Sequence, residues 1–231
     1  MFLSKLVLNP RDRQTRFDIA RPYEMHRTLW RAFPGEEAGG AGRVLFRVDT
    51  DRLGGSPIVL VQSAAEPNWT ALPSGYLLRA AESKLFDLHV SSGQKLRFRL
   101  RANPTKRVAA KNQRLGSVME GKRVGLVTEA DQIAWLLRKA EDGGFRVPGG
   151  WVHEKHKLTS ESVQLPNFRV DVVPEGRDKN DKTGHRDGAF VAVRFDGVLE
   201  VTDPRLFSQT VCAGVGSAKG FGFGLLSVAP A

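Results

Sequence analysis

The stretch RPYEMHRTLW, residues 21–30, brings together three side chains that can do chemistry. Tyr23, His26 and Arg27 lie within five positions of one another, directly after a proline. Histidine transfers protons near neutral pH, a tyrosine hydroxyl can position or relay a proton, and a guanidinium stabilises the charge of a phosphate. The cluster therefore suits acid–base chemistry at a phosphate group. The alternative is that it forms the solvated basic face of an ordinary surface helix.

A helix over residues 22–33 is predicted to position these side chains. A proline in the first turn costs no hydrogen bond, because the first N–H groups of a helix have no partner within it. At helical spacing, Met25, Leu29 and Ala32 form an apolar stripe. The tyrosine, the histidine and the arginine share the opposite surface with Trp30. Exposing two aromatic rings and an imidazole on a short helix is unfavourable unless something stacks or reacts there, which favours a functional site.

The rest of the pattern predicts an α+β protein. Residues 128–144 are expected to form a helix that begins at the capping residue Thr128 and ends at a pair of glycines, and a short helix is expected at 203–214. The order of strands and helices predicts two α+β sandwiches, each a mainly antiparallel sheet with helices on one side. Strand-like runs occur at 2–9, 43–49, 57–63, 94–104, 122–128, 162–173, 188–203 and 224–230.

Excess positive charge points to an acidic partner. The 231 residues include 35 lysines and arginines against 25 aspartates and glutamates, which gives a formal net charge of +10. A domain this basic commonly binds a polyanion, so nucleic acid is the expected partner, although excess arginine can also serve solubility alone. Cys212 is the one cysteine, which excludes an intramolecular disulfide, and no run of about 20 apolar residues is present to span a membrane. We therefore expect a cytoplasmic protein without membrane contacts.

Basic residues recur on the predicted strands. Arg97, Arg99 and Arg101 alternate with apolar residues, which places three guanidiniums on one face of a strand. Lys106 and Arg107 follow directly. The stretch EKHKL is interpreted as a basic strand or hairpin that binds a nucleic-acid stem. Outside the first helix, the expected nucleic-acid-binding residues of these segments are Arg97, Arg99, Arg101, Lys106, Arg107, Lys155 and Lys157.

Four segments, in this order along the chain, resemble the CasE-type CRISPR-associated endoribonucleases, which cut repeat RNA into guide units. They are KLVLNP, PYEMHRTLWRAF, GQKLRFRLRANPTKR and GVGSAKGFGFGLLSVAP. The resemblance covers both ends and the middle of the chain and is missing mainly over residues 148–188. It implies two tandem ferredoxin-like domains, which we expect at residues 1–103 and 104–231.

The resemblance also implies roles for individual residues. Tyr23 and His26 match the catalytic pair of the family, and the glycine-rich C-terminal segment is expected to bring its backbone close to RNA phosphates. The alternative for this segment is a tight turn that leads into an edge strand. The glycines of this segment have neither the spacing of a P-loop nor that of a Rossmann fingerprint. The RNA-lining residues implied in this way are Arg27, Arg31, Lys219, Gly220 and Gly222.

The expected reaction needs neither metal nor cofactor, because an RNA strand carries its own nucleophile. The enzyme has to remove the 2′-hydroxyl proton, protonate the leaving 5′-oxygen and stabilise the phosphorane. The sequence leaves open which of Tyr23 and His26 is the base and which the acid. WVHEKHKL lacks a zinc-binding spacing, and the aspartates at 49–51 and 178–181 belong to turns, so no metal site is expected.

The expected partners are a CRISPR repeat stem-loop and other subunits of a surveillance complex that keeps the mature guide RNA. The rival interpretation is a catalytically silent RNA-binding subunit of the same kind of complex. A third is a general basic RNA-binding protein, which would explain the charge but not the cluster on the first helix.

Overall fold

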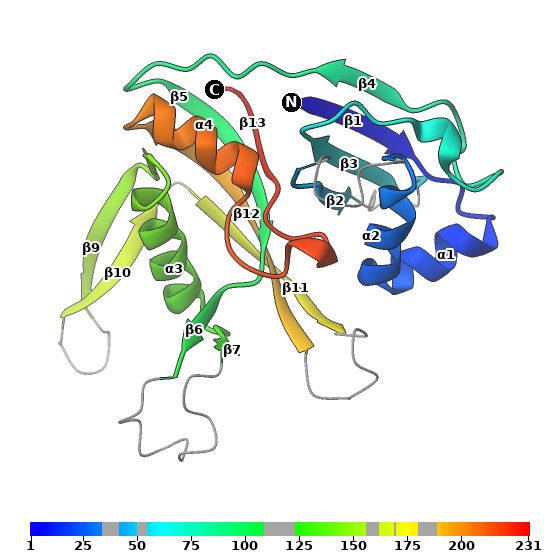
Figure 1. Cartoon of the computed structure of the whole chain (residues 1–231). Helices are drawn as coiled ribbons and strands as arrows, with labels where there is room; N and C mark the ends of the chain where they lie inside the picture. The colour runs from blue at the N-terminus through cyan, green and yellow to red at the C-terminus, as the bar shows by residue number, and fades with distance from the viewer. Residues whose placement is uncertain (34–41, 50–54, 109–122, 156–161, 169, 180–188) are drawn as a thin grey trace.

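Two β-sheets with helices packed against them make up the computed structural model of the chain (Figure 1). The mixture of helices and antiparallel strand pairs confirms the α+β class. Within the ranges that the structure describes, no helix combines the length and apolar character that crossing a membrane requires. These ranges are residues 1–33, 42–49, 55–108, 123–155, 162–168, 170–179 and 189–231.

The first sheet has the strand order β2-β3-β1-β4, and neighbouring strands are antiparallel. Two consecutive helices, α1 and α2, fill the connection between β1 and β2, and a 3₁₀ turn at Trp69–Ala71 lies between β3 and β4. The structure therefore adds one helix, α1, that the sequence pattern did not predict. The bounds are β1 (Phe2–Val7), α1 (Arg13–Ala20), α2 (Pro22–Trp30), β2 (Leu45–Asp49), β3 (Ile58–Ser63) and β4 (Glu82–Leu85).

Helix α2 is held against the first sheet by its apolar stripe. Met25 and Leu29 are fully buried, in one core cluster with Leu6 of β1 and Phe46 of β2. Full burial of such a side chain contributes about 1.5–3 kcal/mol. A helix of nine residues is marginal in water by itself, so this packing is what fixes α2 and the side chains on its other face.

The second sheet has the order β11-β12-β5-β13, with β8 paired to the end of β12. Helices α3 and α4 pack against it, and α3 begins where the sequence predicted, with the Thr128 side chain accepting a hydrogen bond from the backbone N–H of Asp131. The bounds are β5 (Lys95–Ala102), α3 (Glu129–Glu141), β8 (Phe145–Arg146), β11 (Val170–Lys179), β12 (Ala189–Val201), α4 (Pro204–Ala213) and β13 (Leu226–Pro230).

The two sheets share one strand plan. When the four main strands of each sheet are numbered in chain order, with β8 left out, both sheets have the order 2-3-1-4. In each, the first strand lies in the interior, between the third and the last. This is the arrangement of a ferredoxin-like βαββαβ unit, and it confirms two such units in tandem. In the first half the second helix of the unit is replaced by the short turn at Trp69–Ala71.

Strand β5 belongs to the second unit. It pairs with β12 on one side and β13 on the other, and Leu96, Phe98 and Leu100 on it are buried in the second core. The domain boundary expected between residues 103 and 104 therefore lies after β5, the first strand of the second sheet. In the structure, the chain passes from the first sheet to the second in the connection between β4 and β5.

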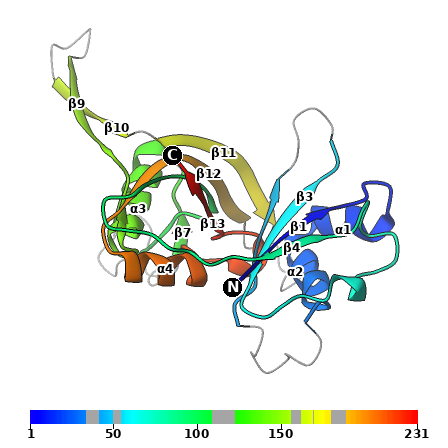
Figure 2. The same cartoon turned by 90° about the horizontal axis from the view of Figure 1, so that it is seen from above.

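Two hairpins extend from the second unit. One consists of β6 (Thr105–Arg107) and β7 (Arg123–Gly125), and the other of β9 (Gly149–Lys155) and β10 (Ser162–Phe168). The β9–β10 hairpin projects away from the body of the molecule (Figure 2). Residues 162–173, expected as a single strand, divide between β10, which pairs with β9, and β11, which pairs with β12.

Polar side chains join the two halves. Arg47 of β2 is only 3% exposed and forms a two-pronged ion pair with Asp49, at 2.9 and 3.0 Å. Its remaining nitrogen donates to the hydroxyl of Ser227 on β13 at 2.8 Å. Gln62 of β3 donates to the carbonyl of Val211 in α4, also at 2.8 Å. Residues from the two sheets can therefore contribute to one site.

Candidate active site

The packing of α2 determines which of its side chains can reach a substrate. The helix begins at Pro22, and its apolar face is buried in the first core. Tyr23 and His26 lie on the other face and are half-buried, while Arg27 is exposed. The surface expected from the helical spacing is therefore present, but its aromatic part is covered on one side by another segment of the chain.

That segment is the glycine-rich stretch of the C-terminal unit, which packs on the start of α2. A β-carbon at Gly220 would lie 3.3 Å from the Cδ2 atom of His26, closer than nearly all real β-carbons come to a neighbour. The ring of Phe221 stacks on Tyr23 with 5.4 Å between the ring centroids. Glycine at position 220 thus lets the loop approach the imidazole, and the two units meet at the reactive side chains.

Gly222 ends this turn in the left-handed region, at φ +78°, where a side chain is strained. A β-carbon there would also come within 3.1 Å of the ring of Phe46. Position 222 is therefore set by the turn and by packing on β2. Its expected contact with RNA phosphates stays a prediction.

Aromatic rings and a hydrogen bond from Trp30 hold His26 in place. Trp30, one turn further along α2, donates its indole N–H to Nε2 of His26 at 3.0 Å. The ring of Phe46 lies nearly parallel to the imidazole, with centroids 6.1 Å apart and planes at 10°. The other ring nitrogen, Nδ1, is buried. Because the centroids of Tyr23 and His26 are 6.4 Å apart, one substrate group can contact both.

A cavity of about 490 Å³, here called the cleavage cavity, opens at these two side chains. Tyr23 and His26 line it together with three cations, Arg43, Arg123 and Lys219. Burial, and to a lesser degree the nearby Arg43, lowers the pKa of the Lys219 ammonium. Cations beside an imidazole and a phenol are suited to bind a phosphate and to stabilise the charge that grows on it during a reaction.

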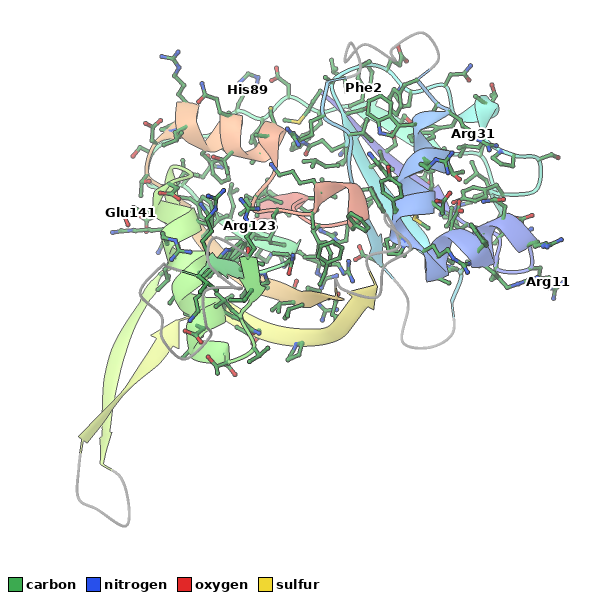
Figure 3. All side chains as sticks on the ribbon, turned by 60° about the horizontal axis from the view of Figure 1, so that its bottom comes forward. Phe2, Arg11, Arg31, His89, Arg123 and Glu141 are labelled. Carbon is green, nitrogen blue, oxygen red and sulfur yellow. The ribbon has the colours of Figure 1, made fainter. Side chains whose placement is uncertain are left out.

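A second hollow, of about 480 Å³, adjoins the cleavage cavity. The two share the wall residues Arg123, Gly216 and Ser217. Figure 3 labels Arg123 on the half that carries α3 and Arg31 on the half that carries α2. We call the second hollow the basic channel, because cations from β6, β7 and α3 line it. They are Lys106, Arg107, Arg123, Arg138 and Lys139.

The structure thus brings some of the expected RNA-binding residues together. Lys219 and Gly220 lie on the wall of the cleavage cavity, and Lys106 and Arg107 lie on the wall of the basic channel. Their positions agree with a single path for a nucleic acid strand across both hollows. Contact of each residue with RNA stays a prediction.

Sequence reasoning did not identify the other cations of these walls. Arg43 lies in the segment before β2 and Arg123 begins β7, and only the folded chain brings the two to the cavity. Arg138 and Lys139 lie in the last turn of α3, where positive charge is common because it offsets the helix dipole. The pair was visible in the sequence, but nothing there distinguished a phosphate-binding role from this general preference.

One face of β5 carries Arg97, Arg99 and Arg101, as expected. Two of these arginines, Arg99 and Arg101, form ion pairs with carboxylates of the same unit. Nε of Arg99 donates to Asp196 at 2.5 Å, and Nε of Arg101 donates to Glu175 at 2.6 Å. Arg97 and Arg99 line a different hollow, of about 620 Å³, on the second sheet. RNA binding by these arginines stays a prediction, and a phosphate there would have to compete with the two ion pairs.

The remaining expected residues lie away from the cleavage cavity or outside the described part. Arg27 is exposed and pairs with Glu24 of the same helix at 3.0 Å, and Arg31 is the exposed C-cap residue directly after α2. Lys155 ends β9, but its side chain is outside the described residues, as is the whole of Lys157. In the described ranges, no group of three or more histidine, cysteine, aspartate or glutamate side chains is placed to hold a metal ion.

The chain matches known proteins over its full length. Residues 1–230 match a family described as CRISPR associated protein. The chain is 43% identical to the CRISPR-associated endoribonuclease Cse3 of Thermus thermophilus and 33% identical to the CRISPR system Cascade subunit CasE of Escherichia coli. Each alignment covers 100% of both proteins.

A solved structure of Thermus thermophilus Cse3, bound to an RNA representing a pre-cleavage complex, is also similar. It has a TM-score of 0.80 and 41% sequence identity, with 99% of this chain and 98% of that chain covered. The crystal structure of the CRISPR-associated protein Cas6e from Escherichia coli has a TM-score of 0.68 and 30% identity, with both chains fully covered.

Proposed function

This chain belongs to the family of CRISPR-associated proteins, and we propose that it is the endoribonuclease that processes CRISPR repeat RNA. It binds a repeat stem-loop and cuts the strand beside it to release mature guide RNA. The relatives support this proposal because they match the chain from end to end, so the likeness includes both units and the contact between them.

The observation that carries the proposal is the composition of the cleavage cavity. Tyr23 and His26 line the same cavity as Arg43 and Lys219, although the four residues come from α2, from the segment before β2 and from the C-terminal loop. Proton-transferring groups and cations on one wall are what cleavage of a phosphodiester requires.

The reaction that this arrangement supports is an internal transesterification. The 2′-oxygen upstream of the cut attacks the phosphorus, its proton passes to a base, and the bond from phosphorus to the 5′-oxygen breaks while that oxygen takes up a proton. The products are a 2′,3′-cyclic phosphate and a 5′-hydroxyl. One proton leaves the substrate and one enters it, so the reaction consumes no water and needs no redox partner.

His26 is assigned as the base. Nε2 accepts a hydrogen bond from Trp30, so this nitrogen carries a lone pair and the imidazole is neutral. Tyr23, on the same cavity wall, is assigned as the donor of the proton that the 5′-oxygen needs. Arg43 and Lys219 stabilise the additional negative charge of the phosphorane.

The protein is further proposed to stay with its product inside a multisubunit surveillance complex in the cytoplasm, where repeat RNA is transcribed. Support comes from the relative named as a Cascade subunit, which is 33% identical over its whole length. The basic channel offers a surface that holds the stem after the cut, because four of its cations, Lys106, Arg107, Arg138 and Lys139, do not line the cleavage cavity.

A catalytically silent RNA-binding subunit is the rival function. It would need the basic channel but not the pairing of an imidazole with a phenol in the adjoining cavity. The retention of both side chains on α2, each packed by aromatic neighbours, favours the enzyme.

Incubation of the purified protein with end-labelled repeat RNA in excess EDTA tests the proposal. The expected result is one cut beside the stem, with a cyclic phosphate on the upstream fragment by mass spectrometry. Binding without any cut would support the silent subunit. Cutting that requires added Mg²⁺ would contradict the mechanism.

A further inference from the structure

The hydrogen bond between Trp30 and His26 determines where the imidazole carries its hydrogen. An indole N–H donates and has no lone pair with which to accept. Because Nε1 of Trp30 lies 3.0 Å from Nε2 of His26, Nε2 must be the acceptor. A neutral imidazole has one N–H, so the hydrogen of His26 is on Nδ1.

Nε2 also belongs to the edge of the ring that faces the wall of the cleavage cavity. Nδ1 is buried. The edge formed by Nε2 and Cδ2 faces Gly220, at 3.6 and 3.3 Å from the position of a β-carbon there, and Gly220 lines the cleavage cavity. A free histidine side chain prefers its hydrogen on Nε2, and that tautomer would place the basic lone pair on the buried nitrogen.

We propose that Trp30 is a positioning residue that keeps the basic lone pair of His26 on Nε2, the nitrogen that faces the cavity. The consequence for cleavage rests on the proposed function, whereas the tautomer itself can be observed without RNA. During the reaction the 2′-hydroxyl replaces the indole as the donor to Nε2. Its proton moves to Nε2, the oxygen lone pair forms the new bond to phosphorus, and the indole N–H is unchanged.

The location of Trp30 suits this role. Residues four apart on a helix are neighbours on its surface, so α2 itself places the indole beside the imidazole. The two rings meet edge to face, with centroids 5.9 Å apart and planes at 87°. On its other side Trp30 packs edge to face on Phe33, with centroids 6.0 Å apart. The indole therefore packs on the core of the first unit while its N–H end reaches the imidazole.

Nitrogen NMR of the full chain, labelled with ¹⁵N-histidine, tests the proposal without RNA. The pH is chosen so that imidazoles are neutral, and His26→Ala identifies the His26 signals among the five histidines. In the wild type we expect hydrogen on Nδ1 and a lone pair on Nε2. Trp30→Phe keeps an aromatic ring but removes the N–H, and it should move both signals toward the opposite tautomer.

Trp69→Phe is the matched control. Trp69 is also half-buried in the first unit and donates its indole N–H to a side chain, Ser83, at 3.0 Å, but it does not contact His26. This variant should keep the wild-type signals. In single-turnover cleavage, Trp30→Phe should be slower by about two- to tenfold, the range expected for one lost hydrogen bond, at unchanged RNA affinity. Trp69→Phe should cut at the wild-type rate.

Hydrogen on Nε2 in the wild-type spectrum would overturn the proposal. The wild-type spectrum tests the proposal even if the Trp30→Phe variant fails to fold. A folded Trp30→Phe variant with the wild-type tautomer, or with the wild-type cleavage rate, would overturn it as well. If the wild type shows the expected tautomer but does not cut repeat RNA, the proposed function fails while the assignment of the tautomer stands.

Discussion

Gly220 and His26 lie so close that a β-carbon on the glycine would approach the imidazole Cδ2 to 3.3 Å. The glycine comes from the C-terminal unit and the histidine from α2, so this contact sets the imidazole against the wall of the cleavage cavity. Gly220→Ala should displace the ring by a few tenths of an ångström and slow cleavage by about ten- to a hundredfold, because misplaced reacting groups lose rate steeply. Single-turnover kinetics beside an RNA-binding isotherm measures both effects. Unchanged cleavage would show that the loop does not position His26.

His26→Ala should reduce the cleavage rate by about 10²- to 10⁴-fold, the usual contribution of a general base, and change RNA affinity only a few-fold. Tyr23→Phe retains the ring that stacks on Phe221, so it should slow cleavage less than the loss of the imidazole. Rates for both variants at saturating RNA provide the comparison. Normal cutting by His26→Ala would remove His26 from the mechanism.

A 2′-deoxy nucleotide directly upstream of the cut should block cleavage and leave binding nearly unchanged. The missing hydroxyl is the nucleophile, yet it is a small part of a large electrostatic interface. Cleavage assays and gel shifts with the modified RNA, in EDTA, measure the two properties. A cut in the deoxy RNA would indicate attack by water.

Removal of cations from the basic channel should weaken the salt dependence of RNA binding. Lys106→Ala combined with Arg123→Ala should lower the slope of log K against log salt by roughly 0.7 to 0.9 for each phosphate that the protein no longer neutralises. Arg99→Ala combined with Arg101→Ala is the comparison on the second sheet, where a smaller reduction is expected because a phosphate there has to displace the ion pairs to Asp196 and Glu175. An equal reduction of the slope in both double variants would mean that RNA also displaces those ion pairs.

The free energy of unfolding should depend on the buried hydroxyl of Tyr76. Tyr76 is fully buried and donates to Asp18 at 2.8 Å. Tyr76→Phe should destabilise the protein by about 1–3 kcal/mol, because Asp18 loses a buried donor. Tyr23→Phe changes the other tyrosine of the chain, keeps its ring on Phe221 and is the matched control, with a smaller expected change. Urea unfolding curves measure both.

The same tyrosine predicts a pH dependence. Burial, with Asp18 beside it, raises the pKa of the Tyr76 hydroxyl in the folded protein. An unfolded tyrosine loses its proton near pH 10, so the unfolding free energy should begin to fall as the pH rises above about 10. Tyr76→Phe should lack this part of the decline. The urea midpoint at pH values on either side of 10 provides the measurement, and an equal decline in both proteins would contradict it.

Local patterns were sufficient to predict α2, α3 and β5. The proline start and apolar stripe of α2, the Thr128 cap of α3 and the strict alternation along β5 are each written within about a dozen residues. Helix α1 was not predicted, because it lacks a long apolar stripe. Its one clear sign is Asp12, whose side chain caps the helix by accepting a hydrogen bond from Thr15.

The candidate site could be predicted only where one helix carries it. Tyr23 and His26 are neighbours on α2, so helical spacing alone brings them together. Arg43 is remote from both in sequence and reaches the cleavage cavity through the pairing of strands in the first sheet. In the same way, Glu175 on β11 neutralises Arg101 on β5, and no short-range pattern shows that these two side chains meet.

Both units have the 2-3-1-4 strand order, but they carry different side chains to the two hollows, so they can be regarded as two copies of one fold with different roles. In the first copy, α2, the second of the two helices between β1 and β2, presents the proton-transferring side chains. In the second copy, α3 lies between β5 and β11 and presents Arg138 and Lys139. Because Arg123 and Ser217 lie in both hollows, a strand that occupies the two must bridge both copies. We therefore expect binding and cleavage to require the same RNA pose. An RNA that engages only one copy should be either held without being cut or bound too loosely to react.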